Sequence, residues 1–169
     1  MRTETEKEEF LQLIDENKAI IYKICNSYCP QVSDREDLAQ EIIYQLWKSG
    51  KNFDGEHKFS TWMYRVALNV AISFYRKKRT NRQAVSLSES PPDIEDKDDG
   101  VTAKEENITL LQRFINELKE LDRALMILYL EEKTYREIAE ILGITETNVA
   151  TRISRNKENL KQKFANLQH

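Results

Sequence analysis

Short polar side chains edged by arginines recur at helical spacing near the C-terminus, and this pattern suits hydrogen bonding rather than covalent chemistry. Thr147, Thr151, Ser154 and Glu158 fall on one face of a helix, which Arg152 and Arg155 flank. Short polar groups reach base edges in the major groove of duplex DNA, and guanidinium groups reach phosphates or guanine. The face is therefore predicted to read DNA; the alternative is the solvated side of an ordinary antiparallel helix pair.

A helix-turn-helix is predicted to position this face. Thr134, followed three residues later by Glu137, is typical of a reciprocal capping box, and Gly143 is typical of the left-handed residue that ends a helix. Thr145 is predicted to cap the second helix, with Glu146 near its positive end. Aliphatic residues at helical spacing predict a buried side for each helix: Ile138, Ala139, Ile141 and Leu142 in the first, and Val149, Ile153, Leu160 and Phe164 in the second.

Composition favours an all-α protein. The chain has 169 residues, 40% of them hydrophobic, with four glycines and three prolines. Its formal net charge of −3 conceals an uneven distribution, because 65–82 contains six basic and no acidic residues whereas 89–106 is rich in acids. A basic strip binds phosphate whatever the total charge, since salt screens charges beyond about 8 to 10 Å. No apolar run approaches the roughly 18 residues of a membrane span, so a cytoplasmic protein is expected.

The pattern along the chain predicts two small helical domains, 1–82 and 107–169, joined by a flexible acidic linker over 83–106. In the first domain, helices are expected over 10–28, from a Ser33–Glu36 capping box to about residue 50, and from 60 to about 79, with a loop over 51–58. In the second, a helical stripe begins at Ile108, and Asp122 is predicted to cap the helix that leads into the helix-turn-helix.

No arrangement of residues typical of catalysis occurs. Cys25 and Cys29 lie four residues apart, but a metal site needs two further ligands, and neither His57 nor His169 fits a ligand pattern. The two cysteines are expected to be free, buried, small hydrophobic residues. A Ser-His-Asp or Cys-His set and a glycine-rich phosphate loop are also missing. We therefore expect no enzyme activity, no catalytic residue, no metal or other cofactor and no small-molecule substrate.

The helix expected after Ser60 combines aromatic with basic residues. Its interior face is predicted to consist of Met63, Val66, Ala67, Val70 and Phe74. Aromatic rings interleaved with arginine and lysine suit single-stranded nucleic acid, because exposed bases stack on the rings while cations follow the backbone. The alternative is an aromatic core helix with a solvated basic end.

Three stretches in this order resemble one family: DREDLAQEIIYQLW, FSTWMYRVALNVAISFYRKKR and TYREIAEILGITETNVATRISRNKENL. They are similar to the small extracytoplasmic-function (ECF) group of bacterial RNA polymerase sigma factors, which keep sigma regions two and four only. The resemblance covers nearly the whole chain except the linker and the extreme ends. It implies a sigma factor that binds core polymerase, recognises a promoter at two elements and helps to open it.

The resemblance also implies roles for particular residues. The helix from Asp34 is similar to the one that docks on the β′ clamp helices of polymerase, through Asp37, Gln40 and Glu41, with capping and solvation as the alternative for each. The minus-ten contact, including a flipped base of the non-template strand, falls on Phe53, Trp62, Tyr64, Arg65, Asn69, Arg76, Lys77, Lys78 and Arg79, with helix packing as the alternative for Trp62 and Tyr64. The duplex contact at the minus-thirty-five element falls on Thr147, Thr151, Arg152, Ser154, Arg155 and Lys157.

Two departures limit the transfer: Ala150 stands where the family often has lysine or arginine, and Ser73 where it often has aspartate. The acidic linker resembles tethers that thread toward the RNA exit channel, although a merely solubilising role explains its charge equally well. An anti-sigma factor is an expected partner. Two other function classes remain open from the residues: a stand-alone helix-turn-helix regulator, and a helical adaptor such as an inactive sigma mimic.

Overall fold

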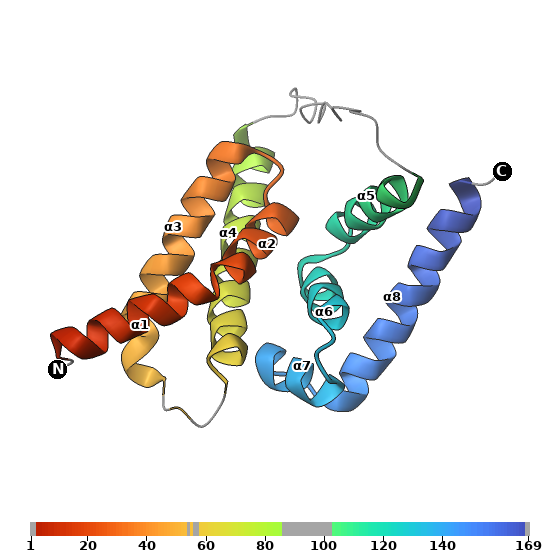
Figure 1. Cartoon of the computed structure of the whole chain (residues 1–169). Helices are drawn as coiled ribbons and strands as arrows, with labels where there is room; N and C mark the ends of the chain where they lie inside the picture. Colours follow the sequence, from red (N-terminus) through yellow and green to blue (C-terminus); the bar gives the residue numbers. More distant parts are fainter. Residues whose placement is uncertain (1–2, 54, 56–57, 86–102, 168–169) are drawn as a thin grey trace. The chain divides into compact units, whose positions relative to one another are not determined.

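The computed structural model describes residues 3–53, 55, 58–85 and 103–167, and every element in these ranges is a helix (Figure 1). The predicted all-α fold is thus confirmed. In chain order the elements are α1 (Glu4–Glu16), α2 (Lys18–Tyr28), α3 (Val32–Ser49), the short 3-10 helix η1 (Gly50–Asn52), α4 (Phe59–Val85), α5 (Ala103–Asn116), α6 (Glu120–Leu130), α7 (Tyr135–Leu142) and α8 (Glu146–Leu167). The chain divides into two compact units, and the boundary along the sequence falls between Tyr75 and Arg76 of α4.

The first helix was expected to run without interruption over 10–28, and this expectation is wrong. Asn17 separates α1 from α2, with backbone angles of φ −110° and ψ 15°. The side-chain amide of Asn17 donates to the backbone carbonyl of Leu13 at 2.8 Å, and this side-chain bond competes with the backbone hydrogen bonds that would continue the helix. The start is also earlier than predicted, because Thr3 and Glu6 form a reciprocal capping box.

The capping box predicted at Ser33 is likewise wrong. Helix α3 starts one residue earlier, and its N-cap, Gln31, makes no side-chain capping bond. The side chain of Arg35 instead holds this end: its Nε donates to the carbonyl of Cys29 at 2.8 Å and a terminal nitrogen donates to that of Pro30 at 3.1 Å. The connection between α2 and α3 is therefore fixed by an arginine side chain.

The first unit has a core formed by α1 to α4, and α3 and α4 run side by side in Figure 1. The buried face of α4 differs from the predicted one. Met63 and Ala67 are buried as expected, whereas Val66, Val70 and Phe74 are only half-buried. The fully buried positions on the other edge of that face are Tyr64, Leu68 and Ala71. Contacts such as that between Tyr28 and Tyr75, with ring centroids 6.2 Å apart, pack α4 against α2.

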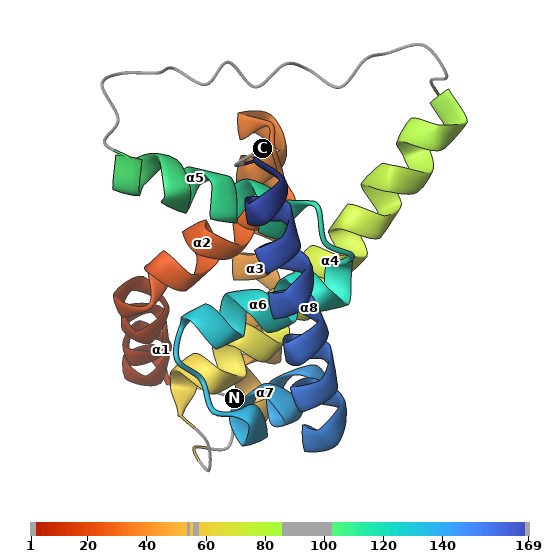
Figure 2. The ribbon, with the colours of Figure 1, turned by 90° about the vertical axis from the view of Figure 1, so that its right-hand side faces the viewer.

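The second unit has the predicted helix-turn-helix, with α7 and α8 packed against α6 (Figure 2). Gly143 adopts the left-handed conformation at φ 70°, and Thr145 caps α8 through its hydroxyl oxygen, which accepts from the backbone N–H of Asn148 at 3.0 Å. Thr134 caps α7, but only half of the expected reciprocal box forms, because the carboxylate of Glu137 accepts from the Thr134 hydroxyl.

Buried aliphatic residues fill the second unit as the pattern predicted. Val149, Ile153 and Leu160 of α8 are buried, and Phe164 packs half-buried against Phe114 of α5 with ring centroids 5.1 Å apart. One expectation fails here: Lys119, not Asp122, is the N-cap of α6. Asp122 lies in the first turn and its carboxylate accepts hydrogen bonds from α8.

Neither Cys25 nor Cys29 is in a disulfide, and both are buried, as predicted. Helix α4 continues to Val85 and α5 begins at Ala103, so helices cover both ends of the segment 83–106 that was expected to be a linker. The acidic residues between them lie outside the described part of the chain. Within the described ranges, no helix combines the length and apolar character needed to cross a bilayer.

Candidate nucleic-acid interface

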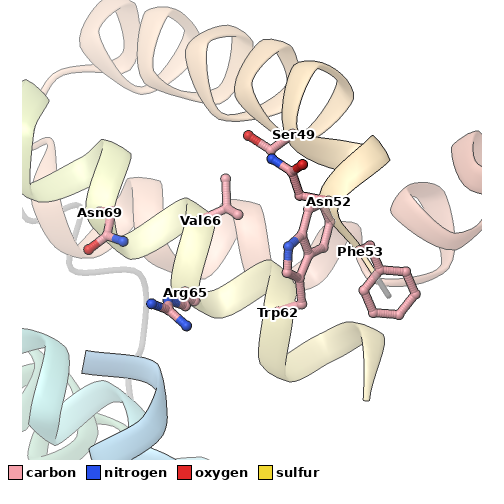
Figure 3. A pocket seen from close by; sticks show the side chains of 7 residues that line it. All are labelled: Ser49, Asn52, Phe53, Trp62, Arg65, Val66 and Asn69. Atoms are coloured by element: carbon pink, nitrogen blue, oxygen red, sulfur yellow. The ribbon is translucent and has the colours of Figure 1, made fainter. Parts of the chain in front are cut away.

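A pocket of about 460 Å³ opens in the first unit between the end of α3 and the start of α4 (Figure 3). Its volume falls within the range of about 300 to 1,000 Å³ that is common for ligand sites. Figure 3 shows residues of η1 and its flanks on one side and residues of α4 on the other. The lining consists of Ser49, Asn52, Phe53, Trp62, Arg65, Val66 and Asn69.

The aromatic wall of this pocket consists of Phe53 and Trp62, which belong to an aromatic cluster that we define as Phe10, Trp47, Phe53, Phe59 and Trp62. The ring of Trp62 lies 5.4 Å from that of Phe53 and 5.5 Å from that of Phe59. The ring of Phe53 meets that of Phe59 edge to face at 5.5 Å. Edge-to-face and tilted contacts therefore hold the two rings that line the pocket, Phe53 and Trp62.

Polar groups complete the pocket. Arg65 and Asn69, one turn apart on α4, are exposed, and Trp62 is half-buried. An aromatic surface beside an amide and a guanidinium suits an unstacked nucleobase, because the ring stacks on the base while the polar groups bind its edge and phosphate. Tyr64 does not belong to this surface: its side chain is 2% exposed and lies in the core. The packing alternative therefore describes Tyr64, and we do not include it in the interface.

The remaining cations predicted for this contact follow along α4. Arg76, Lys77 and Arg79 are exposed and Lys78 is half-buried. Ser73, the position of one family departure, is also exposed, one helical turn beyond Asn69. Arg76 and Arg79 lie 3.8 and 3.4 Å from the carboxylate of Glu120, but their side chains are 63% and 56% exposed, so phosphate groups can still reach them.

A polar and aromatic face occupies the outer side of α3. The three side chains predicted to bind polymerase, Asp37, Gln40 and Glu41, are all exposed. Tyr44, at the same helical spacing, is 56% exposed, and sequence reasoning missed it. An exposed aromatic ring among polar groups is typical of a protein-binding surface, since tyrosine supplies apolar area and a hydroxyl.

On α8 the structure separates the predicted reading residues into two groups. Thr147, Thr151, Ser154, Arg155 and Lys157 are exposed. The ammonium group of Lys157 lies 4.8 Å from the centre of the Tyr129 ring, and hydrogen bonding to Tyr129 is the main reason why its pKa is raised. This lysine is therefore a fixed positive charge beside the reading face.

Arg152 differs from these exposed residues, because its guanidinium group contacts other side chains of the protein. Its side chain is 30% exposed and forms an ion pair with Asp122 of α6 at 3.2 Å. Its Nε donates to the side-chain oxygen of Asn148 at 3.1 Å. Arg152 was predicted as a DNA contact, and the structure places it mainly against protein groups.

The comparisons with known proteins agree with this geometry. The family described as Sigma-70 region 2 matches residues 13–81, and that described as Sigma-70, region 4, matches residues 108–160. The chain is 29% identical to the ECF RNA polymerase sigma factor SigW of Bacillus subtilis, over 96% of this chain and 92% of the relative. It is 32% identical to the RNA polymerase sigma factor SigZ of the same organism, over 75% of this chain and 70% of the relative.

The chain belongs to the ECF group of RNA polymerase sigma factors. The fold of this sigma factor is similar to that of the sigma factor RpoE of Bartonella quintana, which was solved in complex with the anti-sigma factor NepR. The TM-score is 0.70 at 19% identity, over 92% of this chain and 96% of the other. This likeness shows that the fold is shared.

The two family matches lie within the segments 1–82 and 107–169 that were expected to resemble regions two and four, and the role of this sigma factor in transcription initiation follows from the family. Sequence reasoning missed residues that become visible only when elements pack together. Ser49 and Asn52 line the pocket next to Trp62, although nothing in their local pattern distinguishes them from other polar residues near a helix end. Asn148 is another such residue, because its significance depends on Arg152 and, through it, on α6.

Proposed function

We propose that this sigma factor binds core RNA polymerase in the cytoplasm and recognises promoters at two separate elements. Region four contacts the minus-thirty-five element as duplex DNA through the exposed face of α8. Region two separates the strands at the minus-ten element and holds a non-template base in the pocket beside Trp62. The observation that supports this best is the pocket itself, which joins an aromatic wall to Arg65 and Asn69.

The pocket has the chemistry that strand opening needs. A base removed from the duplex stack loses a few kcal/mol, and this loss is recovered by stacking and by hydrogen bonds to its edge. Trp62 and Phe53 supply the stacking surface, and Asn69 and Arg65 supply the polar contacts. The basic residues Arg76, Lys77, Lys78 and Arg79 attract the phosphates of the separated strands.

The outer face of α3 is the proposed contact with the β′ clamp helices. Asp37, Gln40, Glu41 and Tyr44 present two carboxylates, an amide and an aromatic ring to the partner. The side-chain amide of Gln45 donates to Glu41 at 3.2 Å and keeps that carboxylate in place. Polar contacts of this kind determine which partner binds, and the tyrosine ring adds buried area.

An anti-sigma factor is a further proposed partner. The related RpoE was solved with such a protein. This chain has exposed apolar side chains that a protein partner would cover, including Tyr22, Ile108 and Leu167. Co-expression with a candidate anti-sigma factor is expected to give a complex of defined stoichiometry that no longer supports transcription.

Reconstitution with core polymerase tests the main proposal. The purified chain with core enzyme is expected to give run-off transcripts from defined start sites in genomic templates, whereas core enzyme alone is not. A gel-shift experiment with duplex DNA separates the alternatives: a stand-alone regulator binds a symmetric operator tightly without polymerase, and a sigma factor does not. Absence of binding to core polymerase would contradict the proposal.

A further inference from the structure

Asp122 connects α6 to the reading helix α8 through two donors. One carboxylate oxygen, Oδ1, accepts from Arg152 at 3.2 Å and from the side-chain amide of Asn156 at 3.3 Å. Asn156 is 4% exposed, and a buried amide without a partner is costly, so this bond fixes the register of the two helices. The Asp122 side chain is 20% exposed, so its pairing with Arg152 is screened less than that of a surface ion pair.

Arg152 extends this connection to Asn148, one turn earlier on α8. The Arg152 Nε donates to Oδ1 of Asn148 at 3.1 Å. A guanidinium group has only donors, so the Asn148 amide must turn its oxygen toward Arg152 and its Nδ2 group away. The backbone of Asn148 is fixed as well, because its N–H donates to the Thr145 cap. Arg152 is therefore the donor to both neighbours, to the carboxylate of Asp122 on α6 and to the amide oxygen of Asn148 on α8.

Asn148, the last of these three hydrogen-bonded side chains, lies at the edge of the proposed DNA-reading face of α8. Asn148, Arg152 and Arg155 follow each other at spacings of four and three residues, so they share one flank of α8 beside Thr151. Asn148 is half-buried and lies in the first turn of α8. The N-terminal end of the second helix is the part of a helix-turn-helix that enters the major groove. The Nδ2 group of Asn148 is thus a donor whose direction is set by α6.

We propose that Asn148 determines specificity at one base pair of the minus-thirty-five element, and that Asp122 and Arg152 are positioning residues that orient its amide. The inference rests on the proposed function, because it requires α8 to lie in the major groove. A fixed N–H donor pairs with acceptors on a base edge. Guanine presents two acceptors there, N7 and O6, whereas cytosine presents the N4 donor. The bidentate pairing of asparagine with adenine uses the oxygen to which Arg152 already donates. Guanine is the preferred base for the remaining donor, because adenine and thymine each present one acceptor in the major groove and guanine presents two.

Selection of promoters by the reconstituted holoenzyme tests this assignment. The full chain with core polymerase is used to select from duplex templates in which the upstream element is randomised, and the enriched sequences are determined. Asn148→Ala is expected to lower the guanine preference at one position by at least about fivefold, with the other positions unchanged. Asn148→Asp replaces the donor by acceptors and is expected to move that preference to cytosine.

Variants of the positioning residues complete the test. Asp122→Ala and Arg152→Ala are expected to weaken the preference at the same single position as Asn148→Ala. Asp122→Asn serves in its place if Asp122→Ala does not fold. Asn156→Ala is the matched control, because it removes the other donor to Asp122 and leaves Arg152 and Asn148 in contact. It is expected to lower thermal stability without changing the selected sequence.

The outcomes separate the inference from the proposed function. If the wild-type holoenzyme enriches an upstream element and Asn148→Ala enriches the same element with equal preference, the role of Asn148 is overturned. If Arg152→Ala instead weakens binding to all sequences and lowers the salt dependence, Arg152 contacts phosphate and is not a positioning residue. If the wild-type holoenzyme enriches no upstream element, the proposed function itself fails.

Discussion

The ring of Phe10 on α1 lies 6.0 Å from the ring of Trp62 on α4, in an edge-to-face arrangement. Phe10 also contacts Phe59 at 5.9 Å and Trp47 at 6.0 Å, and it is 5% exposed. The N-terminal helix therefore supports the wall of the proposed base pocket from behind. Family comparisons do not show this relationship, because the region-two match begins only at residue 13.

Replacing Phe10 should destabilise the first unit. Phe10→Ala removes a buried ring from the aromatic cluster, and we expect the free energy of unfolding to fall by about 3 to 5 kcal/mol. Urea denaturation followed by the fluorescence of Trp47 and Trp62 measures the change. Leu11→Ala is the matched control, because the neighbouring side chain on α1 is 50% exposed, and its effect should stay within about 0.5 kcal/mol. Equal effects of the two variants would contradict the packing role of Phe10.

Removing a polar group from the pocket should impair promoter opening and spare the fold. Asn69 is exposed, so Asn69→Ala should change stability by less than about 0.5 kcal/mol. The loss of one hydrogen bond to a captured base, about 1 kcal/mol, should lower the yield of open complex about fivefold. Permanganate reactivity of unpaired thymines measures opening.

Ser73→Ala provides the control for this experiment, because Ser73 is exposed on α4 one turn away and does not line the pocket. Opening by this variant should equal that of the wild type. A similar loss in both variants would indicate a general effect on α4 rather than a contact in the pocket.

The turn between α7 and α8 should require glycine at position 143 because of its left-handed backbone conformation and not because of limited space. Gly143 has φ 70°, and a Cβ placed there meets no atom within 4 Å. Gly143→Ala should therefore cost about 1 to 2 kcal/mol through the left-handed conformation without any clash. Gly143→Asn should cost less, since asparagine tolerates this conformation better. Thermal unfolding of both variants checks the order, and a larger loss for asparagine would contradict it.

The buried thiol of Cys25 should make stability depend on alkaline pH. Burial, together with the neighbouring Cys29, raises the Cys25 pKa from 9.0 to about 12, although Arg35 opposes the shift. A thiol with a higher pKa in the folded state stabilises the fold fully below pH 9 and loses that contribution as the pH rises toward 12.

Comparison with Cys25→Ala isolates this effect. Between pH 9 and 12, the unfolding free energy of the wild type should fall more steeply than that of Cys25→Ala, by up to about 1.4 kcal/mol per pH unit. The two proteins should show the same slope between pH 6 and 8. Parallel curves over the alkaline range would show that Cys25 titrates normally.

Local signals made much of the fold predictable. Gly143 ends α7 and Thr145 caps α8 through contacts with residues nearby in the sequence, so the helix-turn-helix could be placed from the sequence. The errors occur where a side chain has a better partner than the local pattern suggests. Asp122 is a good helix cap by type but binds Arg152 and Asn156 of α8, and Asn17 ends a helix by binding Leu13. The hydrophobic periodicity of the sequence cannot show which partner a polar side chain binds, because this depends on which helices pack together.

The site was predictable in the same uneven way. The exposed hydroxyls of α8 follow from helical spacing alone, and the structure presents them as expected. The family resemblance gave Tyr64 either a role at the minus-ten contact or one in helix packing, and the structure buries it in the core. Asn148 was missed because its orientation comes from Arg152, whose own partner lies on another helix.

Helix α8 has a buried side that packs in its unit and an exposed side, and this separation has an evolutionary consequence. Val149, Ile153 and Leu160 bind the helix to its unit, whereas Thr147, Thr151 and Ser154 are exposed and contribute little to the core. Substitutions at the exposed positions cost little stability. Under the proposed function, a duplicated copy of this gene can therefore change its promoter specificity by substituting a few surface residues of α8, at little cost in stability.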